Sequence, residues 1–174
     1  MQPKNLRLPP VDIYRAPFVE PIGHLAMQAA RTEQLIISLL GAIPFDGSDQ
    51  QMSHGAVEPK TRDLQSDSAF ILERLSLIDN ADLRKQVGEA IDQFKRLKEF
   101  RNRVIHDAVE VGISMEGKAF ALAVAYQREK RNPSVVHLHP VEAHQIAELA
   151  CEFYELNQDI DALLYRIRHQ EAPE

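Results

Sequence analysis

The chain has 174 residues and a formal net charge of −6, with 20 Lys and Arg residues against 26 Asp and Glu residues. This charge excludes nucleic-acid binding through the charge of the protein as a whole, and the single cysteine, Cys151, excludes an internal disulfide. The longest apolar run, residues 35–45, is interrupted by Ser38, Gly41 and Pro44 and is too short to span a bilayer. We therefore expect one cytoplasmic domain with no membrane segment.

Residues 1–17 contain four prolines and predict an extended N-terminal arm. A first helix is predicted from about residue 20 to residue 40, because apolar residues recur there at helical spacing. Glu33 falls in the centre of the apolar face of this helix, where an unpaired carboxylate is unfavourable. Residues 42–59 contain two prolines and two glycines and predict a long loop.

A second helix is predicted from about residue 61 to residue 78, and Asn80 is placed to cap a third helix that begins at about Ala81. Apolar residues alternate after His106, which predicts strands within residues 111–139. Pro140 is predicted to open a last helix that ends at about residue 168.

The predicted fold class is mainly α, a four-helix bundle with a small β-hairpin or meander inserted before the last helix. Residues 18–170 are expected to form one helical domain, with the β insertion at about residues 111–139.

Arg101 lies in the middle of the apolar stripe of the third helix, whose other members are Phe94, Leu97, Phe100, Val104 and Ile105. A buried guanidinium requires a partner, and Glu33 is the matching charge on another apolar face. We therefore predict that Glu33 and Arg101 approach within salt-bridge distance inside the bundle.

Arg101, Asn102 and His106 together form the pattern Arg-Asn-x3-His near the end of this helix. The pattern resembles the motif of the HEPN superfamily, and its setting on a late amphipathic helix is similar as well. The resemblance implies an α-helical bundle that is usually dimeric. Many members of that superfamily are metal-independent ribonucleases, and others have no shown activity.

The three residues are chemically sufficient to cleave RNA without a metal ion. Histidine transfers protons near neutral pH, and the planar fork of arginine matches phosphate oxygens. Asn102 would orient one of them or bind the substrate. The resemblance implies that two copies of the motif face each other across a homodimer. We therefore expect catalytic roles for Arg101, Asn102 and His106, a supporting role for Glu33, an RNA substrate, and no metal or cofactor.

Other interpretations remain open at this point. The Glu33–Arg101 pair could be structural only, and the chain would then be a non-catalytic HEPN-fold interaction or nucleotide-binding module. A third hypothesis is a metal site built from His137, His139 and His144, although no carboxylate or cysteine completes an obvious set. Seven basic residues against three acidic ones between residues 84 and 106 also place positive charge around the motif, or form an ordinary solvated face.

Overall fold

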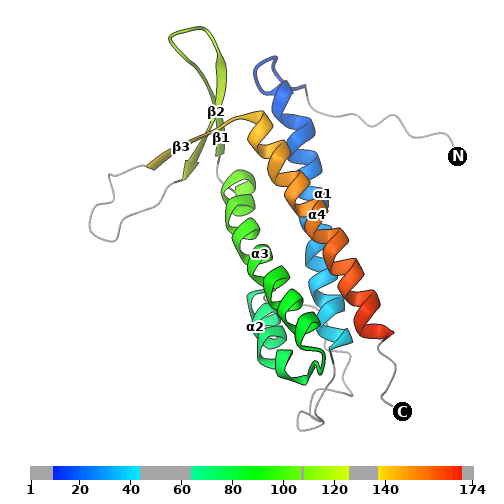
Figure 1. Cartoon of the computed structure of the whole chain (residues 1–174). Coiled ribbons are helices and arrows are strands. Elements are labelled where there is room, and N and C mark those ends of the chain that lie inside the picture. The colour runs from blue at the N-terminus through cyan, green and yellow to red at the C-terminus, as the bar shows by residue number, and fades with distance from the viewer. Residues whose placement is uncertain (1–9, 44–63, 107, 126–136, 170–174) are drawn as a thin grey trace, which may run out of the picture.

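The computed structural model describes residues 10–43, 64–106, 108–125 and 137–169. Its four helices are α1 (Ala16–Ala42), α2 (Leu64–Arg74), α3 (Ala81–His106) and α4 (Ala143–Arg168), and a 3₁₀ turn at Leu75–Leu77 follows α2. The four helices pack together (Figure 1), so the predicted mainly α fold class is confirmed. None of the described helices is long and apolar enough to cross a membrane.

Helices α1 and α4 run side by side in the same direction, whereas α3 runs opposite to α4 (Figure 1). On α1, Gln28 contacts Asn157 and the later residue Arg31 contacts Asp161, so residue numbers increase together along the two helices. On α3, Asp82 pairs with Arg166 at the end of α4, and Arg96 pairs with Glu152 nearer its start. The bundle is therefore not a simple alternation of up and down helices.

Three strands lie between α3 and α4 in the chain: β1 (Ala108–Ile113), β2 (Ala119–Ala125) and β3 (His137–Val141). They form an antiparallel sheet in the order β1-β2-β3, in which Ala108 lies opposite Val124 and Leu122 lies opposite Pro140. The positive φ angle of Gly117, 78°, suits the turn between β1 and β2. The sheet lies at the end of the bundle where α3 ends and where α1 and α4 begin (Figure 1).

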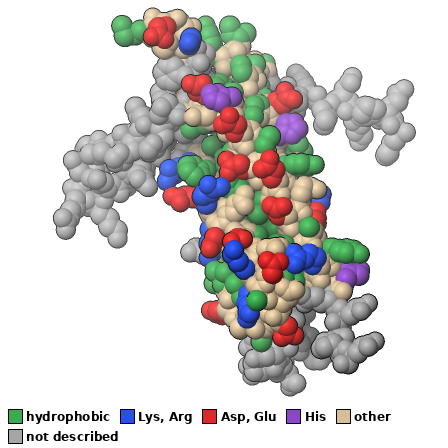
Figure 2. Space-filling model, viewed as in Figure 1, with side chains coloured by type: hydrophobic (Ala, Val, Ile, Leu, Met, Phe, Trp, Pro, Cys, Tyr) green, Lys and Arg blue, Asp and Glu red, His purple; other side chains and the backbone are tan. Residues whose placement is uncertain are grey.

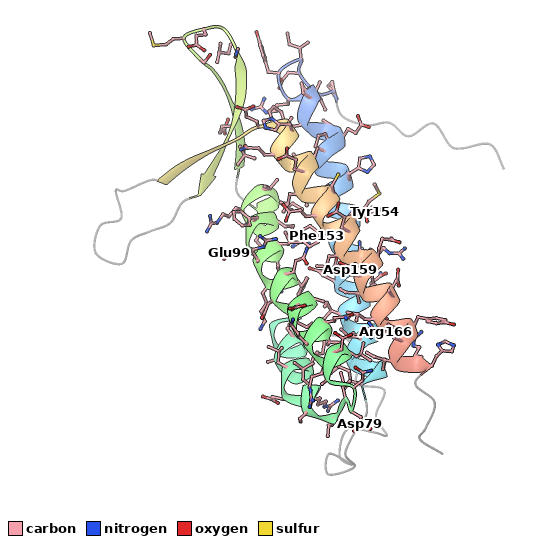
Figure 3. All side chains as sticks on the ribbon, in the orientation of Figure 1. Asp79, Glu99, Phe153, Tyr154, Asp159 and Arg166 are labelled. Atoms are coloured by element: carbon pink, nitrogen blue, oxygen red, sulfur yellow. The ribbon has the colours of Figure 1, made fainter. Side chains whose placement is uncertain are left out.

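The core of the bundle is apolar and draws on all four helices. Its largest fully buried side chains are Phe94, Phe153, Leu25, Ile36, Leu39, Ile71, Ile78, Leu83, Ile91, Leu97, Ile146 and Leu156. The consecutive residues Phe153 and Tyr154 lie on different sides of α4: Phe153 points into the bundle and Tyr154 faces out (Figure 3).

Two predicted helix starts are wrong. The last helix begins at Ala143 and not at Pro140, which lies in β3. Proline is tolerated there because β3 is an edge strand, where a missing N–H removes no ladder bond on the open side. Glu142 forms the N-cap instead, in a capping box with Gln145. The first helix begins at Ala16, four residues earlier than predicted, with Pro17 in its first turn.

The remaining boundaries are close to those predicted. Asn80 Oδ1 accepts a hydrogen bond of 3.0 Å from the Leu83 backbone N–H, which confirms it as the cap of α3. The predicted second helix ends in the 3₁₀ turn, and the described strands lie within residues 108–125 and 137–141. Residues 1–9 of the predicted arm and residues 44–59 of the predicted loop lie outside the described residues.

The start of α1 is tied to the sheet by charged side chains. Arg15 pairs with Asp12 at 2.6 Å and lies 3.5 Å from Glu110 on β1. The hydrogen bond from the Arg15 side chain lowers the pKa of the Asp12 carboxyl group, and backbone N–H groups of Arg15 and Tyr14 act in the same direction.

Candidate functional site

Arg101 lies in the next-to-last turn of α3, at the centre of the face that α3 buries. Phe94, Leu97 and Val104 on this face are buried, and Ile105 is packed against the core. The side chain of Arg101 is correspondingly only 19% exposed. A cation near the C-terminus of a helix is favoured by the helix dipole, which partly offsets the cost of burial.

The predicted approach of Glu33 and Arg101 is confirmed. Glu33 Oε1 on α1 lies 3.7 Å from Arg101 Nη2, and the Glu33 side chain is 26% exposed. This distance is that of an ion pair but is longer than a hydrogen bond. Solvent also reaches the pair. The two side chains are therefore less buried than their positions in the middle of apolar helix faces had suggested.

Arg101 is weakly bonded for an arginine in this position. Its Nη1 donates a hydrogen bond of 3.0 Å to Asn102 Oδ1, and its buried Nε has no hydrogen-bond acceptor among the described residues. Arg103, in contrast, is more exposed but approaches Glu99 to 2.8 Å. The guanidinium of Arg101 therefore retains donors that Glu33 and Asn102 do not use.

The structure thus brings together three of the four predicted site residues, Glu33, Arg101 and Asn102. His106 is the last residue of α3, and its side chain lies outside the described part of the molecule. On an ideal helix, the five-residue separation from Arg101 to His106 corresponds to about 140° of rotation, with a rise of about 7.5 Å.

One member of the predicted apolar stripe is not in the core. Phe100 is half exposed, and the guanidinium of Arg103 lies 5.7 Å from the centre of its ring. Phe100 sits about 100° from Arg101 around the helix axis, at the edge of the buried face. It therefore provides an aromatic surface beside the motif, a role that its spacing in the sequence does not distinguish from core packing.

Positive charge does not accumulate around the motif. Of the basic residues on α3, Lys85, Lys95, Arg96 and Arg103 each pair with a carboxylate. Acidic and basic side chains are accordingly interspersed over the face of the molecule that Figure 2 presents. The basic residues between residues 84 and 106 are therefore best explained as part of a solvated helix face, which was the simpler of the two interpretations.

The structure gives no support to the histidine metal site. His144 Nδ1 lies 3.1 Å from the carboxylate of Glu142, next to the N-cap of α4. His137 and His139 are alternate residues of β3, and their side chains lie outside the described ones. Within the described part of the chain, no group of three or more His, Cys, Asp and Glu side chains is arranged to hold a metal ion.

Sequence patterns did not reveal a groove of about 650 Å³ between the first halves of α1 and α4. His24 and Gln28 line it from α1, and Cys151 and Tyr154 line it from α4. No local signal indicates this groove, because its lining comes from two helices that are far apart in the sequence.

No family model, curated protein or solved structure matches this chain. Function is therefore inferred from the chemistry of four residues and from their positions in the bundle: Glu33, Arg101, Asn102 and His106.

Replacing Glu33 with Gln is expected to lower the free energy of unfolding by about 1–2 kcal/mol, because it leaves the buried part of the Arg101 charge without its counterion. The cost is below that of a fully buried pair because solvent reaches both side chains. Urea titration would measure it, with Glu89→Gln as the control, since Glu89 pairs with Lys85 on the exposed face of α3. Equal stability of the two variants would contradict a stabilising role for the Glu33–Arg101 pair.

Proposed function

We propose that the chain is a HEPN-like, metal-independent endoribonuclease that uses Arg101, Asn102 and His106, with two copies forming one cleft. The observation that carries this proposal is the state of Arg101, a cation mostly withdrawn from water but making only one hydrogen bond to a described side chain. Structural arginines in proteins usually satisfy most of their donors. Unused donors on an oriented guanidinium suit a ligand with several anionic oxygens, such as a phosphodiester.

The proposed reaction starts from the 2′-hydroxyl of RNA. That oxygen attacks the adjacent phosphorus as a base removes its proton, and the 5′-oxygen of the next nucleotide leaves with a proton from an acid. His106 is proposed for proton transfer, with the second copy supplying the other group of the acid–base pair. Arg101 is proposed to stabilise the charge on the phosphorane oxygens, and Asn102 to hold Arg101 in place. The products are a 2′,3′-cyclic phosphate and a 5′-hydroxyl.

Glu33 would have a supporting role in this mechanism. Its carboxylate lies on the α1 side of Arg101. At 3.7 Å it attracts the guanidinium electrostatically but does not form a two-pronged hydrogen bond with its N–H donors. The pair thereby limits the positions of Arg101 while leaving donors free for a substrate.

A second candidate function is favoured by the same ion pair. Glu33 neutralises the charge of Arg101, and the other basic residues around the motif are largely paired. Such a site would attract RNA weakly. The chain would then be a non-catalytic HEPN-fold interaction or nucleotide-binding module, with the Arg101 cluster serving the packing of α1 on α3.

Incubation of the purified protein with mixed RNA in EDTA would separate the two functions. The ribonuclease predicts cleavage in the absence of metal and 2′,3′-cyclic phosphate ends. Arg101→Lys should slow cleavage by roughly 10²-fold or more, because lysine keeps the charge but loses the fork. Arg103→Lys is the matched control, since Arg103 lies on the same helix and is exposed. Failure of the wild-type protein to cut any RNA would favour the non-catalytic module.

A further inference from the structure

The outward side of α1 differs from the outward sides of the other long helices. Nine exposed residues lie within about 100° of arc along α1, and none of them is charged. We call them the α1 outer face: Ala16, Val19, Gly23, Ala26, Met27, Ala30, Gln34, Ile37 and Gly41. The exposed sides of α3 and α4, in contrast, carry acidic and basic residues on almost every turn (Figure 2).

The exposure of the large apolar side chains on this face needs an explanation. Val19, Met27 and Ile37 are each more than half exposed, although all three are on a long helix that buries its other side in the core. Exposed apolar residues that occur singly are ordinary, but a continuous uncharged face along a whole helix is typical of an interaction surface.

Two glycines on the same face add independent support. Gly23 and Gly41 are helical, neither has a positive φ angle, and a Cβ atom at either position would meet no described atom within 4 Å. Glycine destabilises a helix relative to alanine, so these positions carry a cost that nothing described in the monomer requires. Gly88 on α3 differs, because Leu75 Cδ1 would lie 3.5 Å from an added Cβ.

We propose that the α1 outer face binds the α1 outer face of a second copy of this chain, with the two helices antiparallel and the twofold axis beside Ala30. Val19 and Gly41 lie equally far from Ala30, as do Gly23 and Ile37. Antiparallel pairing therefore sets Val19 against Gly41 of the partner subunit and Ile37 against Gly23 of the partner subunit. Val19 and Ile37 therefore each meet a glycine, so the face is complementary to itself at these two pairs of positions.

Charge also favours α1 over α3 and α4 as the contact between two copies. Two molecules that each carry a net charge of −6 repel each other. Along α1 they can meet without burying any charged side chain, whereas contact through α3 or α4 would press charged residues together.

The size of the face indicates a reversible dimer. The face is about 39 Å long, and a helix contact about 10 Å wide would cover roughly 400 Å² on each copy. The total of roughly 800 Å² is below that of stable complexes and in the range of transient ones. We therefore expect association at micromolar concentrations.

This interface would also bear on the Arg101 site. Glu33 lies one helical turn from Ile37, at the edge of the face next to α3. The twofold axis that relates two antiparallel helices lies in the interface and is perpendicular to both helices. It therefore places the α3-facing edges of the two α1 helices on the same side of the dimer. The two Glu33–Arg101 pairs would then flank the interface on a common side.

The decisive variant is Ala30→Glu, which places like charges at the twofold axis while leaving the exposed helix intact. Sedimentation equilibrium between about 1 and 200 μM should show a dimer for the wild type and a dissociation constant at least roughly tenfold higher for the variant. The matched control is Ala69→Glu, at an exposed alanine of α2. Circular dichroism would confirm that both variants keep their helices.

Cross-linking tests the register of the proposed pair. In a Cys151→Ser background, which removes the native thiol, Ala30→Cys should form a disulfide-linked dimer with an added oxidant, and Ala69→Cys should not. A monomer at 200 μM, or a dimer that Ala30→Glu leaves unchanged, would overturn the proposal. The surface is independent of the ribonuclease proposal: a dimer through α1 that cuts no RNA would refute only the latter.

Discussion

Replacing His106 with alanine is expected to slow RNA cleavage by roughly 10²–10⁴-fold, the usual effect of removing a residue that transfers protons in the rate-limiting step. The expectation follows from the proposed reaction, in which the attacking hydroxyl and the leaving oxygen both exchange a proton. Among the residues proposed for the site, His106 is the one whose side chain is suited to this transfer near neutral pH. The initial rate on a defined single-stranded RNA, with EDTA present, is the measurement.

The control for this prediction is His144→Ala. His144 is exposed on α4, beside Glu142, and belongs to no part of the proposed site. A DNA strand of the same sequence provides a second control, because without a 2′-hydroxyl it should remain intact. If His106→Ala cuts RNA as fast as the wild type, the cleavage comes from another residue or from a contaminant, and the assignment of His106 fails.

Replacing Asn157 with alanine is expected to lower the free energy of unfolding by about 2–3 kcal/mol. Asn157 is fully buried on α4, and its Nδ2 donates to the Gln28 backbone carbonyl at 3.2 Å and to Gln28 Oε1 at 3.1 Å. Its Oδ1 accepts from Thr32 Oγ1 at 2.7 Å. Alanine would remove these bonds and leave a cavity between α1 and α4.

Two further variants test how this effect arises. Thr32→Val keeps the volume but leaves Asn157 Oδ1 without its donor, so we expect a smaller loss of about 1–2 kcal/mol. The combined variant should lose less than the sum of the two, because both changes act on one network. Gln158→Ala, at an exposed position of the same helix, should stay within about 0.5 kcal/mol of wild type in urea titrations. An Asn157→Ala protein as stable as that control would show that the network does not stabilise the α1–α4 pairing.

Much of the helical architecture could be predicted from residue periodicity. The interruptions of otherwise apolar faces by Glu33 and Arg101 were informative, because a buried charge constrains which faces meet. The prediction that Glu33 and Arg101 meet uses a local anomaly that only a few tertiary arrangements can satisfy. The partners of Asn157, in contrast, are identified by the structure as Gln28 and Thr32.

The errors arose where tertiary context decides between similar local signals. Pro140 is compatible with a helix start and with an edge strand, and only the position of β3 in the sheet distinguishes them. Phe100 satisfies the apolar spacing of α3, but it lies at the edge of the buried face and is half exposed. The groove beside Cys151 and Tyr154 likewise depends on how α4 lies against α1.

The parallel pairing of α1 with α4 has a consequence for synthesis of the protein. The most extensive helix contact joins the first and last helices, so its residues are far apart in the chain and the bundle has a high contact order for an α protein. After α1 ends at Ala42, about 100 residues must be translated before α4 begins at Ala143. At 5–20 residues per second, the apolar side of α1 waits roughly 5–20 s for its main partner. We therefore expect the nascent chain to depend on chaperones over this interval, more than a bundle of sequentially paired helices would.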